Sequence, residues 1–575
     1  MSDSNMTVTV SSNPVIPSSR VKYGLIRQKT REILESLSDD DLLIPSVVET
    51  ELLEGCNIMI EAENLSREGR KWKYLETLLP MQIADALITT YPIVKIAGAD
   101  DGNDSSNDLI AIYQEDGVDK GIYSSDEAVL RNLIRKYSYN ISSKDVSEVI
   151  SILQDTLPRK FRCKQPNLIA VNNGIFDYDT KQLMPFDPKY VFLSKCRVNY
   201  NPNATNVVIH NNSDNTDWDV ESWMDELTDD PEITHVLWQI LGAIIRPNVP
   251  WGKAAWFYSE TGNNGKGTLC ELMRQLCGQG SYASISLADF SKEFMLEPLV
   301  RATSIIVDEN DVGTYIDRAA NLKAIITGDT IFINRKFKMP IAYQFKGFMV
   351  QCLNEMPRIK DKSDSFFRRQ LFIPFTKCFT GMERKYIKHD YLHRSEVLEY
   401  VLYRVLHMDY YELDTPSACV DALEEYKTYV DPIREFLEEI MPKVKWDLLP
   451  FQFLYDMYVS WYKQTHSGDR NIKSLRSFSN DVKLLVKSSY PSWACTDAST
   501  GMRPSDRMLD AEPLIATYSL DKWMNPMYNT DRDNDRKCRP AVLASRYRGV
   551  YRLIRQQGSD EDLILSNDAD DDETE

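Results

Sequence analysis

The residues best suited to chemistry in this sequence lie in the stretch AAWFYSETGNNGKGTLCELMRQLC. A turn rich in glycine and asparagine leads there into Lys266 and then into an amphipathic segment. Successive backbone N–H groups of such a turn can point at one anion, and the N-terminus of a following helix adds partial positive charge. The lysine can reach the β- and γ-phosphates of a nucleotide. We therefore predict an ATP-binding loop formed by Gly262, Asn263, Asn264, Gly265, Lys266, Gly267 and Thr268.

Two positions of this loop depart from the common pattern G-x-x-x-x-G-K-[ST]. Glu260 replaces its first glycine, and Gly267 follows the lysine where the pattern has a serine or threonine that binds Mg²⁺. Either Thr268 takes over as a metal ligand, or the metal is held through water. An ordinary strand, turn and helix without a ligand is the alternative interpretation of the segment.

Two acidic residues follow the β-branched run ATSIIV about forty residues later. We predict that Asp308 holds Mg²⁺, directly or through water, together with Thr268. Glu309 is predicted to orient and polarise the attacking water. A strand that simply runs into a turn would give the same residues, but their position after a phosphate loop favours a catalytic role.

Polar residues also flank two further apolar runs. In GFMVQCLNEMP, Asn354 follows the run and can sense the γ-phosphate or position the same water. In SDSFFRRQLFIPF, Arg368 and Arg369 precede the run. A guanidinium there suits a finger that stabilises the γ-phosphate bound to a neighbouring subunit, although one of the pair can equally be a structural ion-pair partner.

A basic, aromatic hairpin is predicted between the acidic residues and Asn354. In LKAIITGDTIFINRKFKMPIAYQFKG two β-prone runs flank a short turn. Such a tip can contact backbone phosphates and stack on a sugar or base, whereas a solvated turn is the alternative. The predicted DNA-binding residues are Arg335, Lys336, Phe337 and Lys338.

The elements that must position these side chains are short apolar strands alternating with amphipathic helices. Residues 254–258 read as a strand, the segment after Lys266 as a helix, and the runs before Asp308 and Asn354 as further strands. In a parallel sheet the carboxyl ends of such strands lie at one edge, so we expect an α/β fold. Upstream, residues 21–159 are expected to be mostly helical with one short strand in DLIAIYQEDG, and residues 376–407 to be helical.

The order of the motifs NNGKGT, IIVDEN, LKAIITGD…INRKFK, CLNEMP and FFRRQLFIPF resembles that of the superfamily 3 helicases, AAA+ motors of viruses, phages and mobile elements. It is most similar to the poxvirus-type and phage/plasmid primase-associated branch. The flanking segments NNGIFDYDTKQLMPFDP and DPIREFLEE resemble modules of that branch as well, so that the resemblance covers roughly residues 100–555.

The resemblance implies an α/β AAA+ P-loop NTPase core, in which helices flank a parallel sheet, with an N-terminal α+β module and a C-terminal, mostly helical, winged-helix-like domain. It implies a homo-hexameric ring that hydrolyses ATP with Mg²⁺ and moves along single-stranded DNA, usually 3′ to 5′, gripping the strand with pore hairpins. Further expected partners are a forked DNA duplex and a separate primase or polymerase. Because no N-terminal primase–polymerase module is evident, primase activity is not predicted.

We expect six segments: a flexible N-terminus (1–20), a helical and β module of primase–helicase type (21–200), a linker (201–217), the motor with leading helices (218–407), a winged-helix-like DNA-binding or loading domain (408–555) and an acidic disordered tail (556–575).

No secretory signal and no run of apolar residues long enough to span a membrane is seen in the sequence. The ten cysteines have neither zinc-site nor disulfide spacing, which is typical of a reducing compartment. The expected location is the cytoplasm of a bacterial host or of a virus-infected cell.

The formal net charge of −19 argues against a nucleic-acid partner only if the charge is evenly spread. Residues 251–376 contain 16 Lys and Arg against 13 Asp and Glu, while residues 559–575 alone carry nine acidic side chains. The chain can therefore hold DNA in a narrow, locally basic pore.

Two alternatives to a replicative helicase remain. One is an origin-binding AAA+ initiator or regulatory ATPase without processive unwinding, and the other is a nucleoside monophosphate kinase, which needs an Arg-rich lid within one compact domain of about 200 residues.

Overall fold

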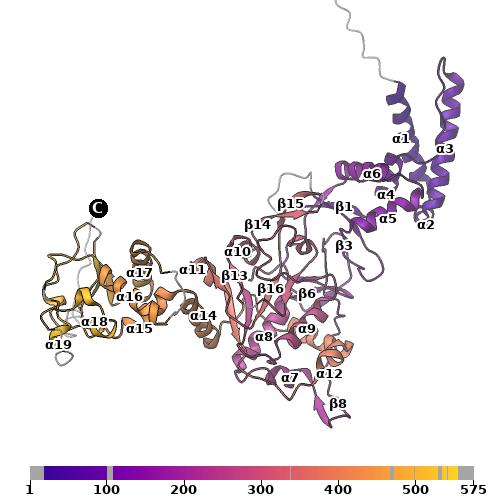
Figure 1. The fold of residues 1–575 in the computed structure, drawn as a ribbon. Coiled ribbons are helices and arrows are strands. Elements are labelled where there is room, and N and C mark those ends of the chain that lie inside the picture. The colour runs from indigo at the N-terminus through magenta and orange to yellow at the C-terminus, as the bar shows by residue number, and fades with distance from the viewer. Residues whose placement is uncertain are drawn as a thin grey trace, which may run out of the picture. The chain divides into compact units, whose positions relative to one another are not determined.

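The computed structural model describes residues 18–99, 108–311, 313–336, 338–465, 472–497, 499–528, 534–540 and 542–553. The acidic tail, Phe337 and most of the N-terminus expected to be flexible lie outside these residues, as does the side chain of Lys338. The chain divides into two compact units, residues 1–423 and 424–575 (Figure 1). The first unit confirms the expected mixed α/β fold with a parallel sheet.

The N-terminal part of the first unit packs helices around a small sheet of strand order β3-β2-β1-β4. We expected a single strand here, and the three others were missed because four-residue and two-residue strands are too short to show the alternation that marks a strand. The elements are α1 (Ser18–Ser36), α2 (Asp39–Leu42), α3 (Pro45–Ser66), α4 (Pro80–Thr90), β1 (Ile93–Ile96), β2 (Leu109–Tyr113), β3 (Tyr123–Ser124), α5 (Glu127–Tyr137), α6 (Ser143–Thr156) and β4 (Arg159–Lys160).

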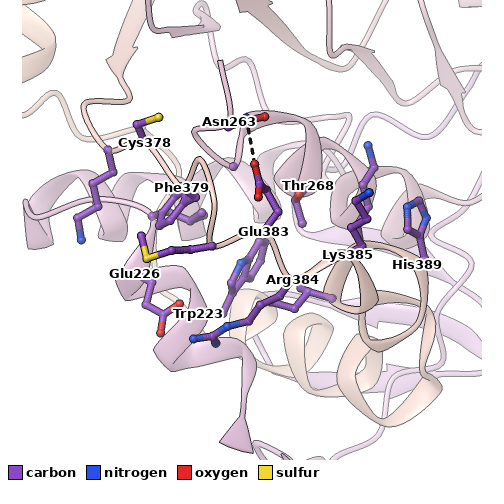
Figure 2. A pocket seen from close by; sticks show the side chains of 16 residues that line it. Trp223, Glu226, Asn263, Thr268, Cys378, Phe379, Glu383, Arg384, Lys385 and His389 are labelled. Carbon is purple, nitrogen blue, oxygen red and sulfur yellow. Dashed lines mark hydrogen bonds between the residues drawn. The ribbon is translucent and has the colours of Figure 1, made fainter. Parts of the chain in front are cut away.

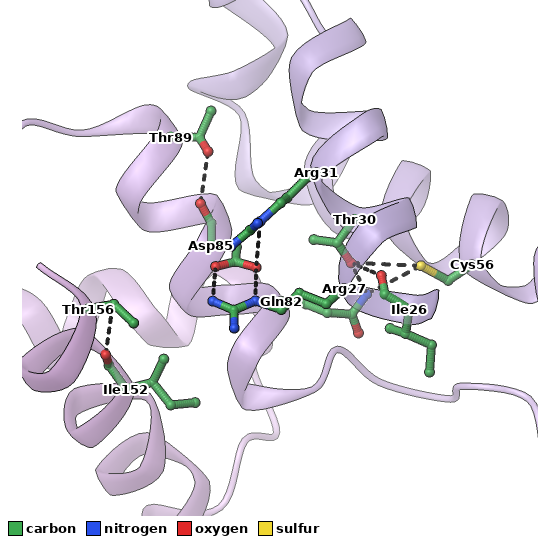
Figure 3. A network of polar contacts seen from close by, with 10 residues as sticks. All are labelled: Ile26, Arg27, Thr30, Arg31, Cys56, Gln82, Asp85, Thr89, Ile152 and Thr156. Atoms are coloured by element: carbon green, nitrogen blue, oxygen red, sulfur yellow. Dashed lines mark hydrogen bonds and ion pairs between the residues drawn. The ribbon is translucent and has the colours of Figure 1, made fainter. Parts of the chain in front are cut away.

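A polar network joins α1, α3 and α4 inside this part (Figure 3). Arg27 donates from Nε and Nη2 to the two carboxylate oxygens of Asp85, at 3.2 and 3.3 Å. Gln82 Nε2 donates to Thr30 Oγ1 at 3.2 Å and lies 3.5 Å from Cys56 Sγ. Because Asp85 and Gln82 are buried, leaving either without a partner would be costly. The network therefore fixes the position of α1 against α3 and α4.

Short antiparallel strands follow before the parallel sheet begins. A hairpin of β8 and β9 lies largely within residues 201–217, where we expected only a polar linker. This hairpin is anchored to the rest of the first unit by Trp218, which is buried. The ring centroid of Trp218 lies 5.3 Å from that of Tyr391 and 6.4 Å from that of Trp223. The elements are β5 (Leu168–Val171), β6 (Gly174–Asp177), β7 (Gln182–Met184), β8 (Ile209–Asn211), β9 (Thr216–Trp218), α7 (Val220–Glu226) and α8 (Pro231–Ala243).

The centre of the first unit is a five-stranded parallel sheet of order β11-β12-β16-β10-β18. Strands β12 and β16 are buried along their whole length, which explains why their sequences are continuous apolar runs rather than alternating ones. Helices α8, α9 and α13 contribute to the same apolar core as the sheet. The elements are β10 (Ala254–Tyr258), α9 (Lys266–Cys277), β11 (Tyr282–Ala283), β12 (Ser304–Val307), β16 (Phe348–Leu353), β18 (Gln370–Pro374) and α13 (Ser395–Leu406).

A long hairpin of β14 (Thr330–Arg335) and β15 (Lys338–Gln344) lies between β12 and β16 in the chain. Arg162 holds the base of this hairpin: Nη1 donates to Tyr343 Oη at 2.8 Å, and Nη2 donates to the carbonyls of Gly98 and Gln344. Its guanidinium also lies over the ring of Tyr343, 4.5 Å from the centroid. Other short elements here are η1 (Glu297–Val300), β13 (Tyr315–Ile316), α10 (Ala320–Thr327), β17 (Arg358–Ile359) and α11 (Asp364–Phe367).

The segment after β18 is not helical over residues 376–384, so our expectation of a helix there was wrong. Helix α12 (Lys385–His389) begins only after this irregular segment, and η2 (Tyr391–His393) leads on to α13. Gly381 has φ of +83°, which interrupts a helix, and Phe379 N–H donates to the carbonyl of Asn263 at 2.7 Å instead of to a helical partner. We call residues 376–384 the strap, because they pass over the predicted phosphate loop.

The second unit has its own aromatic-rich core and an antiparallel sheet of order β19-β21-β20. It begins at Glu424, whereas we expected a boundary after His407; Leu413 and Cys419 are buried in the core of the first unit. No helix in the described residues is both long and apolar enough to cross a membrane. The elements are α14 (Ser417–Val430), which contains the boundary, α15 (Pro432–Ile440), β19 (Leu448–Pro450), α16 (Phe451–Thr465), α17 (Leu475–Ser489), β20 (Trp493–Cys495), η3 (Ser505–Arg507), α18 (Leu514–Thr517), η4 (Asp521–Trp523), α19 (Asn534–Lys537) and β21 (Gly549–Arg552).

Candidate active site

The predicted phosphate loop connects β10 to the N-terminus of α9. Gly265 is the N-cap of this helix with φ of +83°, and a Cβ atom there would lie 2.5 Å from Leu227 Cδ2. Only glycine fits this position without a shift of Leu227. Asn263 also has a positive φ of 55°, which asparagine tolerates better than most residues. The loop thus leads into the N-terminus of a twelve-residue helix, where Lys266 N–H donates to Asn264 Oδ1 at 3.4 Å and Thr268 N–H to the carbonyl of Gly265 at 3.1 Å. The partial positive charge of such a helix end is favourable for an anion.

The structure joins Lys266 to Asn354 across 88 residues of sequence. Lys266 Nζ donates to Asn354 Oδ1 at 3.1 Å. The two residues meet because β10 and β16 are parallel neighbours, with Tyr258 opposite Leu353. Lys266 is only 4% exposed, and this burial lowers the pKa of its ammonium group. Within the described residues no other partner takes its N–H groups, so two of them remain for a ligand.

Asp308 and Glu309 lie at the carboxyl end of β12, on the far side of β16 from β10. Arg274 of α9 donates to both oxygens of Asp308, with Nη2 2.8 Å from Oδ1 and Nη1 3.2 Å from Oδ2. Partial burial acts to raise the pKa of Asp308, but the hydrogen bonds and charge of Arg274 outweigh it, and the pKa is lowered. Glu309 is exposed and forms no hydrogen bond or ion pair within the described part of the chain.

Sequence reasoning missed two residues that hold this strand end in place. Arg274 gave no signal, because a basic residue on an amphipathic helix is ordinarily solvated. Asn310 is buried, and its Nδ2 donates to Gln351 Oε1 at 3.0 Å and to the carbonyl of Cys352 at 3.1 Å. The only hint in the sequence was a third polar residue directly after the acidic pair. Asn310 ties the end of β12 to β16 and so fixes where Glu309 stands.

The two predicted arginines lie at the opposite edge of the sheet from Lys266. Both arginines directly precede β18, and the first residue of β18 pairs with the first residue of β10. Lys266 follows the other end of β10, and the strand is about 13 Å long. Arg369 is engaged within its own chain, since Nη1 donates to the carbonyl and to Oγ of Ser365. Arg368 is exposed, and its guanidinium has no partner among the described residues. The structure therefore separates the two, with Arg369 structural and Arg368 available.

A cavity of about 570 Å³ opens beside the phosphate loop, between α7, the strap and α12 (Figure 2). This volume lies within the range of about 300–1,000 Å³ that is usual for small-molecule sites. Asn263 Nδ2 donates to Glu383 Oε1 at 3.2 Å, which fastens the strap to the loop. The apolar part of the lining consists of Trp223, Leu227, Phe379, Met382 and Ile387, and the basic part of Lys377, Arg384, Lys385, Lys388 and His389.

None of these lining residues outside the loop was predicted from the sequence. The sequence predicts that the strap is part of a helix and that α7 is only a leading element of the motor. Figure 2 shows Trp223, Phe379 and Arg384 grouped around the cavity that Thr268 of α9 also borders. A pocket that joins apolar side chains to a helix N-terminus and to cations suits a ligand with a flat or apolar part and a phosphate part.

The donor set at the loop fits a magnesium ion of the kind that accompanies nucleotide phosphates. Thr268 offers a hydroxyl in the first turn of α9, and the Asp308 carboxylate keeps lone pairs beyond those that Arg274 uses. Within the described residues, no group of three or more His, Cys, Asp or Glu side chains is arranged around one point. Mg²⁺ commonly takes one or two protein ligands and completes its shell with phosphates and water, so two donors suffice.

The predicted DNA-binding residues do not share the cavity; the described ones lie on the hairpin β14–β15. Arg335 donates from Nε and Nη2 to the carbonyl of Met339 within the hairpin, at 3.3 and 3.1 Å. Phe332 and Met339 are 74% and 67% exposed. Lys336 lies in the turn, while Phe337 is outside the described residues. The hairpin therefore presents exposed apolar side chains beside its basic turn, and the role of Arg335 in it is at least partly structural.

Three family models match this chain. One described as "D5 N terminal like" matches residues 63–240, one described as "Poxvirus D5 protein-like" matches residues 430–510, and a "Family of unknown function (DUF5906)" matches residues 257–369. The last range contains the phosphate loop, the acidic pair, the hairpin, Asn354 and both arginines. The first two matches lie on either side of the parallel sheet in the chain.

The solved structures that match this chain include three of the NrS-1 C terminal region. One of them covers 82% of this chain and 99% of its own, with a TM-score of 0.41 at 12% identity. Another covers 74% of this chain and 98% of its own, with a TM-score of 0.39 at 15% identity. The third covers 72% of this chain and 86% of its own, with a TM-score of 0.37 at 14% identity.

Proposed function

Since this chain belongs to the phage and poxvirus type of superfamily 3 helicase–primases, whose D5-like models match it before and after the parallel sheet in the chain, we propose that it is an ATP-dependent DNA helicase that acts in replication. In this proposal the first unit contains an AAA+ core. The proposed assembly is a hexameric ring that moves 3′ to 5′ on single-stranded DNA at a forked duplex, beside a separate primase or polymerase.

One observation carries the proposal: polar residues from three separate motifs converge on one edge of one sheet. Lys266 follows β10, Asn354 follows β16 and contacts Lys266, and Asp308 and Glu309 follow β12, which is the next strand. Ligands of parallel α/β sheets bind at the carboxyl ends of the strands. Strand ends that carry a lysine, an amide and two carboxylates beside a helix N-terminus provide the groups needed to bind and hydrolyse a nucleoside triphosphate.

Each residue has a defined task in this proposal. The N–H groups of the loop and Lys266 bind the phosphates, and the apolar part of the cavity receives the nucleoside. Thr268 and Asp308 hold Mg²⁺, which neutralises phosphate charge when it is bound. Glu309 orients the attacking water, and Asn354 positions the γ-phosphate or that water. Arg274 keeps Asp308 ionised and fixed in orientation.

A finger from the neighbouring subunit is proposed at Arg368. Its place at the amino edge of the sheet, about 13 Å along β10 from the phosphate loop, supports action on another subunit rather than on its own site. Its lack of a partner within the described chain supports the same role. A ring of like subunits would place this edge beside the next phosphate loop, which is why the proposed assembly is a closed oligomer.

The second unit is proposed to be a winged-helix-like module that binds or loads DNA. Three helices, α15, α16 and α17, pack with a three-stranded antiparallel sheet, which is an arrangement compatible with that fold. The match to the poxvirus D5 protein-like model over residues 430–510 lies within this unit and supports a replication role.

Replacing Lys336 and Lys338 together by alanine is expected to spare basal ATP hydrolysis and to remove its stimulation by single-stranded DNA. The hairpin residues lie outside the cavity, so the basal reaction does not need them, whereas phosphate contacts on the hairpin couple DNA to the motor. The measurement is the ATPase rate with and without a single-stranded oligonucleotide at two salt concentrations.

The matched control replaces Lys144 and Lys189, two exposed lysines in the same unit, and should keep the stimulation of the unsubstituted protein. Equal stimulation in the hairpin variant and the control would remove the hairpin from the DNA-binding role.

A further inference from the structure

The first turn of α9 has an unusual neighbour. Gly267 stands directly after Lys266, where nucleotide-binding loops commonly have a serine or threonine. A Cβ atom at Gly267 would lie 3.8 Å from Lys388 Nζ. The ammonium group of Lys388 therefore rests against the helix turn that presents the N–H groups of the phosphate loop, on the side left open by the missing side chain.

Lys388 is held at this place by its neighbours along the chain. Ile387 is buried in the core that α9 also joins, and His393 Nε2 lies 3.1 Å from the carbonyl of Lys388. The same imidazole nitrogen lies 3.4 Å from Glu271 Oε1 of α9. These contacts link the backbone around Lys388 to α9 and so hold the lysine close to the phosphate loop.

The Lys388 ammonium itself has no acceptor in the described structure. Lys388 is half-buried, and its Nζ forms no hydrogen bond or ion pair with any described residue. The carboxylate of Asp308 already accepts two N–H groups from Arg274. Lys388 lines the cavity together with Gly265 and Thr268 of the phosphate loop, so its charge is available to an anionic ligand there.

We propose that Lys388 is a second phosphate-binding lysine, which contacts the β- or γ-phosphate of the bound nucleoside triphosphate from the side of α9 that Gly267 leaves open. This inference rests on the proposed function, because it adds a residue to the same nucleotide site. It also explains the departure of the loop from the usual pattern: with glycine at position 267, the space beside the helix turn is filled by a lysine from α12 rather than by a hydroxyl.

The test replaces Lys388 by methionine, which keeps the length of the side chain and removes its charge. Binding of a fluorescent ATP derivative, measured by anisotropy, should weaken about tenfold to a hundredfold, as for a lost hydrogen bond to a charged group. Competition by unlabelled pyrophosphate should weaken by a similar factor, and Lys388→Arg should restore both. If pyrophosphate competes equally well in Lys388→Met, or if ATP affinity is unchanged, Lys388 does not bind phosphate.

Two further measurements separate this inference from the proposed function. Lys144→Ala, on α6, should match the unsubstituted protein, and thermal unfolding should give the same Tm for Lys388→Met, since its Nζ has no partner to lose. If Lys388→Met is instead destabilised, Lys388→Gln replaces it in the binding assay, with the same expected loss. Failure of the unsubstituted protein to bind ATP, or full binding by Lys266→Ala, would overturn the proposed function itself. Loss of binding in Lys266→Ala with normal binding in the Lys388 variants would overturn this inference alone.

Discussion

Replacing Lys266 by alanine is expected to lower kcat/KM for ATP hydrolysis by about a hundredfold to a thousandfold, as when one group that stabilises transition-state charge is removed. Lys266 is buried at the N-terminus of α9, and its ammonium is shared only with Asn354 in the described structure. Removing it takes away the charge that both binds the phosphates and stabilises charge as the γ-phosphate leaves. The measurement is steady-state phosphate release over a range of ATP concentrations.

The control for this variant is Lys144→Ala, an exposed lysine on α6 of the same unit, which should retain normal rates. Folding of both variants is compared by thermal unfolding, because a misfolded protein would also lose activity. Phosphate release by folded Lys266→Ala within about twofold of the unsubstituted protein would remove the loop from the nucleotide site, because the expected loss is far larger.

Replacing Glu309 by glutamine is expected to separate binding from hydrolysis. The single-turnover rate should fall by about a hundredfold or more, because a general base contributes about 10²–10⁴-fold. The Kd for ATP should change little, since Glu309 forms no hydrogen bond or ion pair with a described residue and its removal leaves Lys266 and Asp308 in place. Glutamine keeps the shape of the side chain and loses only the basic carboxylate.

The matched control is Asp311→Asn, an exposed carboxylate two residues further along the same loop. It should keep a normal single-turnover rate and a normal Kd. An equal loss in both variants would mean that the rate responds to the charge of the whole loop, and Glu309 would then have no separate catalytic role.

The strand ends of the site could be predicted from sequence because their signals are local. The loop before Lys266 and the apolar runs before Asp308 and Asn354 each show their residue types within a few positions. Parallel pairing then brings such ends to one edge, whatever the details of the rest of the fold. The contact between Lys266 and Asn354 has this origin.

The cavity could not be predicted in this way, because its walls come from segments that are unremarkable by themselves. The strap looks like the start of a helix until Gly381 and the hydrogen bond from Phe379 to Asn263 are seen. The pairing of Arg274 with Asp308 likewise depends on how α9 lies against β12. Lys388 is one of several basic residues near α12 in the sequence, and only its distance from Gly267 sets it apart.

The two arginines show how far a motif alone can be interpreted. From the sequence, Arg368 and Arg369 were equal candidates for a finger. The backbone turn before β18 directs the Arg369 guanidinium to Ser365 and leaves Arg368 exposed. The side chains of these two neighbouring residues therefore have different surroundings, and only Arg368 is left without a partner among the described residues.

The central claim is best tested by strand displacement on forked DNA. The substrates carry either a 3′ or a 5′ single-stranded tail of equal length, and product is followed with a fluorescent label in the presence of ATP and Mg²⁺. We predict displacement that requires ATP and the 3′ tail and that is absent in Lys266→Ala. ATP hydrolysis stimulated by DNA, with no displacement of either fork, would contradict the helicase proposal and favour an initiator that binds DNA without unwinding it.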